Sequence, residues 1–394
     1  MKICFWIGSA YYRKYGTNKV ASVITNGLTR HDIELVVTES NAAAPYEYAE
    51  HIKIVPLPTN NLIYRLPKRS IIGFIQSILR IFNNKTGFFN TERRYKLLQK
   101  IFYPDKYLRQ LTDFFVAKDY DVIIAVGREI LWLASIADKL RAKTIGWQHN
   151  SYDSYVNKRN FMFWKKEELL KKIIPNLDSF VMLNPYDCQE YKENLGIAST
   201  HISNPLTLQS DIKTDTANKQ FIAAGRFVEQ KGFDLLIDAF NIFCKYNDDW
   251  KLVIAGSGKL FKAMKKRAKK LKKIKDRIEF LGFTNDIQTH YLNSSIYLMT
   301  SRWEGWGLVV TEAFEMGLPV IAFDITPMDI LIDNGENGVI VECFNKTRYA
   351  AAMLKLARDD GLRRKMHESA VVKAREYGVD KIIVEWEKLF ENGG

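Results

Sequence analysis

Short apolar runs alternate along the chain with longer segments whose apolar positions recur at helical spacing. In the first half this pattern predicts strands at residues 2–8, 33–38, 51–57, 121–126, 143–149 and 179–184. It predicts helices at residues 17–30, 128–141, 160–173 and 186–195, and a helical insertion from about 67 to 118. Apolar strands that alternate with amphipathic helices are typical of parallel, doubly wound sheets.

The rhythm restarts after a polar stretch from Asn204 to about Lys219, which lacks apolar periodicity and is typical of a linker. Strands are predicted at residues 220–224, 251–255, 277–282, 296–300, 319–323 and 338–342, and helices at 233–246, 259–271 and 308–316. Three helical segments close the chain, the last over about 379–391. We therefore expect an α/β fold of two Rossmann-like domains, 1–204 and 205–376, that face each other across a cleft.

Length and composition agree with this expectation. The chain has 394 residues, enough for two cores, and 47% of them are hydrophobic. No stretch reaches the roughly 18 consecutive apolar residues of a spanning helix, and residues 1–8 fit a first strand better than a signal peptide. The net charge of +13 predicts attraction to an anionic partner, such as a nucleotide, an acidic lipid headgroup or a nucleic acid.

The four cysteines, Cys4, Cys188, Cys244 and Cys343, are scattered and form no CxxC motif. We expect them to be buried free thiols in a reducing cytosol, and we expect no metal site.

Two cationic side chains are predicted where ligands bind in open α/β sheets, beyond the carboxyl ends of the strands. Arg226 follows the strand at 220–224, and Lys231 with Gly232 opens the next helix. A cation at a helix start is electrostatically unfavourable, so an anion between the two side chains is favoured over a plain surface pair. A diphosphate suits both cations, because each binds it more strongly as negative charge develops on it.

A glycine-flanked turn precedes the helix predicted at 308–316. Its glycines, Gly305 and Gly307, flank Trp306 and allow a ligand to approach the backbone closely. The N–H groups of Leu308 and Val309 would then point at phosphate oxygens.

Two carboxylates, Glu304 and Glu312, lie eight positions apart across this turn. Glu312 is expected to accept two hydroxyl hydrogen bonds from a ribose, and Glu304 is expected to accept hydroxyls of a transferred sugar. An exposed glutamate and an ordinary helix residue are the alternative explanation. The two cations and two carboxylates together predict a nucleotide-sugar site.

These residues carry a family resemblance. Gly225-Arg226-Phe227 with Lys231-Gly232, followed by Glu304 and Glu312 within EGWGLVVTEAFEMGLPVIA, resembles the retaining glycosyltransferases of family 4, which have the GT-B fold. The match is close in the C-terminal half. In the N-terminal half it is limited to the alternation of strands and helices and to a few positions. The resemblance implies that Arg226 and Lys231 bind the donor diphosphate, that Glu304 contacts the donor sugar and that Glu312 binds the ribose.

The resemblance has further implications at four places. The backbone of Gly282, Phe283 and Thr284 would meet the nucleobase, and residues 377–394 would form a helix that packs back on the first domain. His149, at a strand end, would lie beside the reacting sugar, where a structural histidine is the alternative. Gly16 would belong to a glycine-rich loop between donor phosphate and acceptor, although a plain helix start explains it almost as well.

Two basic regions suggest contacts beyond the donor. Within the insertion, apolar residues fall on one helical face with arginines beside it; they are Ile71, Ile72, Ile75, Ile78, Leu79, Phe82, Arg69 and Arg80. This pattern favours contact with an anionic membrane surface, and a core-packed helix pair is the alternative. The lysine-rich segment 259–277 indicates a packed helix with a solvated basic face. Nucleic acid is not expected, because no aromatic stacking surface accompanies the lysines.

We therefore expect a retaining, metal-independent glycosyltransferase without a cofactor. It would move a hexose from a nucleotide-diphosphate sugar, a UDP-sugar in our interpretation, to a glycan or lipid-linked acceptor of cell-surface polysaccharide or lipopolysaccharide. It would act in the cytoplasm, peripherally at the inner face of the cell membrane. The alternatives are a nucleotide-sugar epimerase of the same fold and a basic membrane- or nucleic-acid-binding protein on an inactive scaffold.

Overall fold

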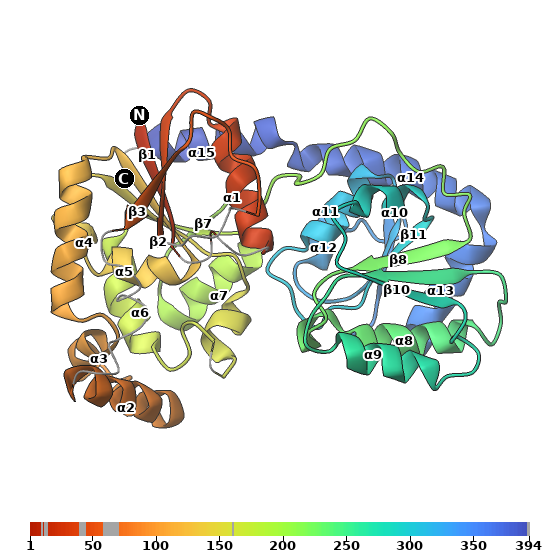
Figure 1. Ribbon diagram of the computed structural model, residues 1–394, viewed down its shortest axis with the longest axis horizontal. Helices are drawn as coiled ribbons and strands as arrows, with labels where there is room; N and C mark the ends of the chain where they lie inside the picture. Colours follow the sequence, from red (N-terminus) through yellow and green to blue (C-terminus); the bar gives the residue numbers. More distant parts are fainter. Residues whose placement is uncertain (9–10, 12–14, 39–44, 58–70, 160, 392–394) are drawn as a thin grey trace. The chain divides into compact units, whose positions relative to one another are not determined.

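The computed structural model describes residues 1–8, 11, 15–38, 45–57, 71–159 and 161–391, and the chain divides into two compact units (Figure 1). Unit 1 comprises Met1–Pro205 and Val379–Gly394, and unit 2 comprises Leu206–Gly378. Each unit has a parallel sheet and a buried apolar core of its own. The predicted α/β class with two Rossmann-like halves is confirmed.

In unit 1 the described strands form one parallel sheet in the order β3-β2-β1-β4-β5-β6-β7. They are β1 (Lys2–Gly8), β2 (Asp32–Thr38), β3 (Lys53–Leu57), β4 (Val122–Val126), β5 (Lys143–Trp147), β6 (Ser179–Met182) and β7 (Thr200–His201). The two-residue β7 was not predicted, since so short a strand has no detectable alternation. The order reverses between β1 and β4, as in doubly wound sheets.

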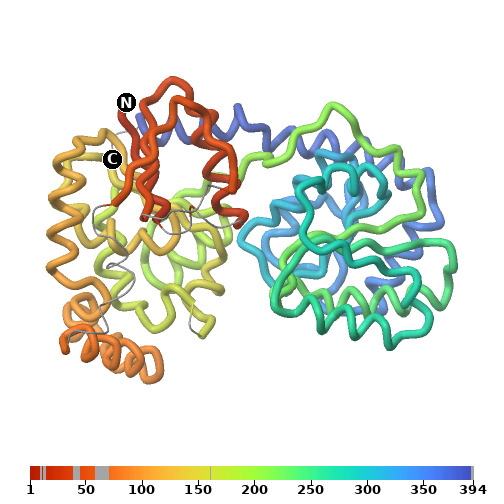
Figure 2. The backbone as a smooth tube through the Cα atoms, viewed as in Figure 1, coloured from red at the N-terminus to blue at the C-terminus, as the bar shows by residue number. Residues whose placement is uncertain are grey.

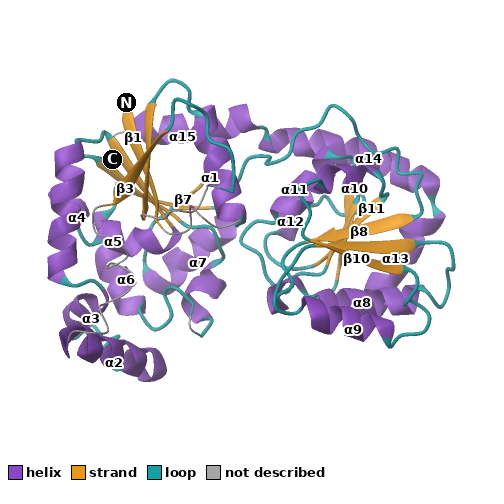
Figure 3. Ribbon diagram, viewed as in Figure 1, coloured by secondary structure: helices purple, strands orange, loops and turns teal. Residues whose placement is uncertain are grey.

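The helices of unit 1 lie around its sheet, apart from two at the edge of the unit (Figure 3). They are α1 (Gly16–Gly27), α2 (Ile71–Thr86), α3 (Tyr95–Phe102), α4 (Asp105–Lys118), α5 (Ile130–Ala134), α6 (Glu167–Ile173), α7 (Pro185–Leu195) and α15 (Val379–Glu391). The predicted insertion is therefore three helices, and its first residues, 67–70, lie outside the described part of the chain.

The last helix, α15, belongs to unit 1 although it follows all of unit 2 in the sequence, as the tube in Figure 2 traces. It packs on α1 at Gly27, where a Cβ atom would lie 2.9 Å from Ile383 Cδ1. Its fully buried Trp386 meets Trp147 edge-on, with ring centroids 4.8 Å apart. The prediction that the C-terminal helix returns to the first domain is confirmed.

Two predicted helices of unit 1 are shorter than the apolar pattern suggests. The helix expected over 128–141 is α5, flanked by the 3-10 turns Gly127–Glu129 and Ala137–Lys139. Ser135 at its end donates its hydroxyl to the carbonyl of Leu131, a local bond that competes with helix continuation. The helix expected over 160–173 begins only at Glu167, because Lys165 has a φ of 54° and interrupts the helical backbone.

Unit 2 contains a second parallel sheet in the order β10-β9-β8-β11-β12-β13. Its strands are β8 (Gln220–Ala224), β9 (Lys251–Ala255), β10 (Ile278–Gly282), β11 (Ile296–Met299), β12 (Val320–Phe323) and β13 (Gly338–Val341). The order reverses between β8 and β11, so ligands are expected at the carboxyl ends of these two strands.

The helices of unit 2 follow the prediction closely, apart from two short ones. They are α8 (Phe233–Phe243), α9 (Phe261–Lys269), α10 (Ile287–Leu292), α11 (Leu308–Glu315), α12 (Met328–Leu331), α13 (Lys346–Arg358) and α14 (Asp360–Ala374). The periodicity did not predict α10 and α12, because helices this short complete too few turns for a pattern to emerge.

Candidate functional site

The loop after β8 brings Lys231 to the point where the strand order of unit 2 reverses. Gly232 is the N-cap of α8 with a φ of 60°, and a Cβ atom there would lie 2.0 Å from the carbonyl oxygen of Thr300, just beyond β11. At Gly225 a Cβ atom would meet the Lys231 methylenes at 3.4 Å. The lysine stem therefore lies along the backbone at the end of β8, close to the end of β11.

We expect Gly232→Ala to destabilise unit 2 by more than about 3 kcal/mol, because the added methyl collides with backbone and the left-handed φ is itself unfavourable. Gly196→Ala is the matched control, since Gly196 has a φ of 67° and open space around its Cβ position. That variant should lose only about 1 kcal/mol. Thermal unfolding of both proteins checks the prediction, and equal losses of midpoint temperature would contradict it.

Lys231 forms an ion pair with Glu304, which follows β11. Lys231 Nζ lies 2.6 Å from Glu304 Oε1, and the two side chains are only 16% and 8% exposed. The neighbouring Gln230 donates from Nε2 to the carbonyl oxygen of Trp303 at 3.0 Å. The sequence interpretation assigned the lysine and the glutamate to different parts of the donor, whereas the structure brings them into direct contact.

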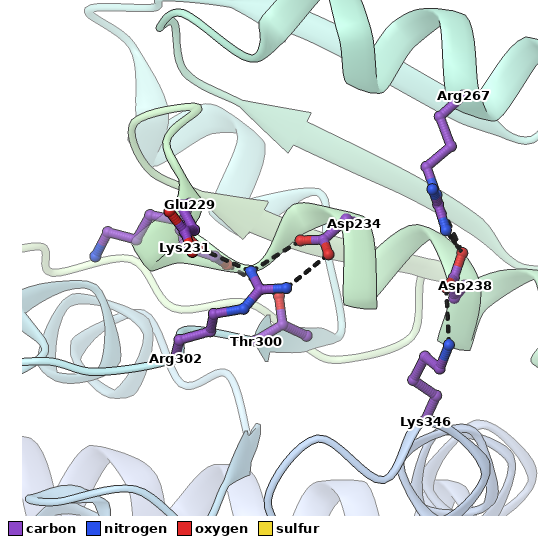
Figure 4. A network of polar contacts seen from close by, with 8 residues as sticks. All are labelled: Glu229, Lys231, Asp234, Asp238, Arg267, Thr300, Arg302 and Lys346. Carbon is purple, nitrogen blue, oxygen red and sulfur yellow. Dashed lines mark hydrogen bonds and ion pairs between the residues drawn. The ribbon is translucent and has the colours of Figure 1, made fainter.

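A second ion pair connects the segment after β8 with the loop after β11 (Figure 4). Arg302 donates from Nη1 and Nη2 to the two carboxylate oxygens of Asp234, at 2.9 and 2.6 Å, and from Nη1 to the carbonyl oxygen of Glu229 at 2.8 Å. Burial raises the pKa of Asp234, but the hydrogen bonds and charge of Arg302 outweigh it and lower the pKa below its ordinary value. Thr300 adds a hydroxyl bond to the carbonyl oxygen of Lys231 at 3.2 Å.

Sequence reasoning missed Arg302 and Asp234. Arg302 stands two positions before Glu304, and Asp234 lies in the first turn of a predicted helix, where an acid is ordinary. Nothing in the sequence at either position indicates that the two side chains form an ion pair. In Figure 4 the Lys231 side chain extends away from this pair, so Arg302 and Asp234 hold the loops while leaving the lysine amine on the other side.

The second carboxylate, Glu312, is buried within α11. Thr207 donates its hydroxyl to Glu312 Oε1 at 2.6 Å, and Tyr291 lies 3.4 Å from Oε2 through its phenol. Burial raises the pKa of Tyr297, and the charges of Glu312 and Glu304 add to that effect, so both carboxylates act on one phenol. The structure thus brings the two predicted acids to the same part of unit 2.

The glycine turn between the acids has the expected backbone geometry. Gly307 precedes α11 with a φ of 110°, and a Cβ atom there would lie 3.0 Å from Met328 Cε. The N–H groups of Leu308 and Val309 stand in the first turn of α11, where N–H groups have no i−4 carbonyl partner within the helix. The side chains of both residues are half-buried.

Trp306 and Gly305 lie in the same turn and are both buried. The Trp306 ring packs edge-on against Tyr377, with centroids 5.3 Å apart, and its Nε1 atom has no hydrogen-bond partner among the described residues. The tryptophan side chain therefore belongs to the packing of unit 2, and a donor contact at this residue has to use its backbone.

The ends of β8, β9 and β10 lie together. The N–H of Gly256 donates to the carbonyl oxygen of Gly282 at 2.7 Å, and a Cβ atom on Gly256 would lie 1.8 Å from the carbonyl oxygen of Gly225. Arg226, two residues beyond the end of β8, is exposed. Sequence reasoning missed the Gly256 turn, although its signal, Gly-Ser-Gly directly after a strand, was present.

The proposed nucleobase segment stands at the end of β10. Gly282 has a φ of 80° with open space at its Cβ position, Phe283 is 53% exposed, and the Thr284 hydroxyl accepts the N–H of Asp286 at 3.0 Å. An exposed aromatic ring beside a glycine turn suits stacking with a planar base.

His149 and Gly16 belong to unit 1. His149 follows β5, and its ring lies on Trp147 with centroids 4.1 Å apart. Its Nε2 atom is buried and has no hydrogen-bond partner among the described residues. Burial lowers the pKa of His149 to about 3, so the ring is neutral at physiological pH and can exchange a hydrogen bond with a hydroxyl group. Gly16 is the first residue of α1.

Within the described residues, no three histidine, cysteine, aspartate or glutamate side chains gather as metal ligands. All four cysteines are free thiols. The expectation that all are buried is wrong for Cys188, which is half-buried, and for Cys343, which is exposed because it lies in the loop beyond the end of β13.

Sequence comparisons relate this chain to known glycosyltransferases. The sequence pattern described as glycosyl transferases group 1 matches residues 207–372. An uncharacterized glycosyltransferase of Haemophilus influenzae is 30% identical over 333 residues, which cover 80% of this chain and 91% of that protein. The amylovoran biosynthesis glycosyltransferase AmsD of Erwinia amylovora is 24% identical over 388 residues, 95% of each chain.

The crystal structure of HepE from Anabaena in complex with UDP superposes with a TM-score of 0.71 at 16% identity, covering 99% of each chain. This likeness is one of fold, and the predicted GT-B architecture is confirmed.

Proposed function

Because the chain belongs to the glycosyl transferases group 1 family, we propose that it is a retaining hexosyltransferase that uses a UDP-sugar. The acceptor in this proposal is a hydroxyl of a glycan or glycolipid made for cell-surface polysaccharide. The family assignment favours transfer over the epimerase and the inactive binding scaffold. AmsD is named for the synthesis of amylovoran, and HepE was crystallised with UDP; both facts support the choice of donor and pathway class.

The observation that carries the proposal is the Lys231–Glu304 pair at the switch point of unit 2. An ammonium beside a carboxylate offers a cation to the β-phosphate and an acceptor to a sugar hydroxyl within one small volume. Arg302 and Asp234 hold both loops in register, so little reorganisation is needed when the donor binds.

In the proposed reaction, the bond between the sugar anomeric carbon and the β-phosphate oxygen breaks as the acceptor hydroxyl attacks from the same face. The departing phosphate oxygen takes the acceptor proton, so no side chain is required as a strong base. Lys231, Arg226 and the N–H groups of Leu308 and Val309 stabilise the negative charge that develops on the phosphate. Neutral His149 accepts a hydrogen bond from a hydroxyl of the sugar or donates one to it. We propose that no divalent ion takes part and that the enzyme acts in the cytoplasm.

Thermal unfolding in the presence of nucleoside diphosphates tests the donor assignment. We expect UDP to raise the unfolding midpoint more than ADP and GDP at equal concentration, because binding to the native state stabilises it. Incubation with UDP-hexoses and a glycan acceptor should then release UDP and give a product with the donor's anomeric configuration, read by NMR. If no nucleoside diphosphate stabilised the protein, the proposal would be wrong. A product with inverted anomeric configuration would refute the retaining mechanism.

A further inference from the structure

Helix α2 turns its apolar side outward. Large apolar side chains recur along it at helical spacing, each between 43% and 80% exposed; they are Ile71, Phe74, Ile75, Ile78, Ile81 and Phe82. We call these six residues the α2 apolar face. A helix of a globular domain normally buries such a stripe against the core.

The opposite side of α2 is polar and faces the protein. Arg80 donates from Nε to the carbonyl oxygen of Ile101 and from Nη2 to that of Phe102, both at 2.8 Å. Buried Asn83 donates to the carbonyl oxygen of Lys165 at 3.0 Å and accepts the N–H of Phe89 at 3.0 Å. These bonds fix the rotation of the helix, so its outward apolar side is a property of the fold.

Figure 3 shows α2 and α3 beside each other at the edge of unit 1, apart from the strands. The exposed side chains of the α2 apolar face therefore lie on an outlying element. Contiguous exposed apolar surface of this kind marks an interaction site.

The charge around this face has one sign. Besides Arg80, which faces the protein, residues 71–100 contain five cations, Lys85, Arg93, Arg94, Lys96 and Lys100. They contain one carboxylate, Glu92, which is paired with Lys172 at 3.0 Å, and α2 itself has no acidic residue. The partner is therefore expected to combine apolar surface with negative charge.

We propose that unit 1 docks on an anionic phospholipid bilayer through the α2 apolar face. A helix of 16 residues is about 24 Å long. It would lie in the plane of the interface with its apolar side chains among the acyl chains and the surrounding cations at the headgroups. No helix in the described part of the chain is long and apolar enough to cross a bilayer, so this contact is a surface one.

A second copy of the chain fits the face less well. Two copies joined through this face would bring their excess cations together.

Sedimentation with lipid vesicles tests the proposal on the full-length protein and needs no nucleotide sugar, so it can fail independently of the proposed function. Wild type should bind vesicles of phosphatidylcholine mixed with phosphatidylglycerol, and should bind pure phosphatidylcholine at least about tenfold more weakly. Ile75→Gln/Ile78→Gln should lower binding to the mixed vesicles about tenfold or more, because two aliphatic side chains that insert among the acyl chains are lost.

The matched control is Val116→Gln/Val372→Gln, which makes polar two aliphatic side chains that are 57% and 61% exposed on other helices. It should bind like wild type. Charge reversal by Lys85→Glu/Lys96→Glu should weaken binding, whereas Lys265→Glu/Lys269→Glu on α9 should not. Equal binding by wild type and Ile75→Gln/Ile78→Gln would overturn the proposal, as would loss of binding only in the α9 variant. Dimers that dissociate in Ile75→Gln/Ile78→Gln, without vesicle binding by wild type, would assign the face to a second copy instead.

Discussion

Replacing Lys231 with methionine is expected to lower the transfer rate about 10³-fold, because the enzyme loses a point charge at the phosphate where negative charge develops. The same change leaves the carboxylate of Glu304 buried without its ion pair. Removing one partner of such a pair costs about 3 kcal/mol, which corresponds to a fall of roughly 5–10 °C in the unfolding midpoint. Steady-state kinetics and thermal unfolding check both effects.

Two controls separate catalysis from stability. Lys231→Met/Glu304→Gln removes the unpaired charge, so its midpoint should return toward wild type while transfer stays low. Lys213→Met breaks a comparable pair, in which Lys213 Nζ lies 2.5 Å from Glu315 Oε1 and the side chains are 24% and 12% exposed. That variant should lose stability but keep its transfer rate when assayed well below its midpoint. A Lys231→Met enzyme with a normal rate would refute the assigned role.

Glu304→Gln is expected to lower transfer about 10²-fold while UDP binds as well as in wild type or more tightly. The amide keeps one acceptor oxygen for the sugar but loses the charge that strengthens hydrogen bonds from sugar hydroxyls. At the same time Lys231 is freed from its paired carboxylate, which increases its attraction for the diphosphate. Transfer kinetics and calorimetric titration with UDP measure the two effects.

Glu315→Gln is the control for Glu304→Gln, because it neutralises the glutamate of the Lys213 pair instead. We expect both its transfer rate and its UDP affinity to stay near those of wild type. Full transfer activity in Glu304→Gln would show that the carboxylate does not contact the reacting sugar. A parallel loss of UDP affinity and rate would place Glu304 in nucleotide binding rather than in recognition of the sugar.

Much of the fold was predictable because it depends on local pattern. The strands at 220–224 and 251–255 and the helix at 379–391 have the predicted bounds. Each combines a clear apolar period with polar or glycine residues at its ends. The pattern was misleading over 128–141, where buried apolar residues form a short helix and 3-10 turns, since a continuously apolar stretch carries no period that marks where a helix ends.

The candidate site was predictable in its members more than in their arrangement. Lys231, Glu304 and Glu312 stand out in the sequence because they follow strands and glycine turns. Their assignment as ligand contacts stays a prediction. The partners Thr207 and Tyr291 of Glu312 were not identified, because a threonine in a linker and a tyrosine on a short helix carry no signal of their own.

The sequence by itself determined two doubly wound domains and the chemical groups of a nucleotide-sugar site, because apolar periodicity and glycine turns act over a few residues. Only the tertiary structure decided that Lys231 pairs with Glu304, 73 positions away, and that Arg302 and Asp234 hold their loops. It also decided that α2 faces outward with its apolar side. The apolar residues of α2 have the same spacing in the sequence whether the helix buries or exposes them. The direction in which they point depends on the hydrogen bonds that Arg80 and Asn83 donate to carbonyl groups of other segments.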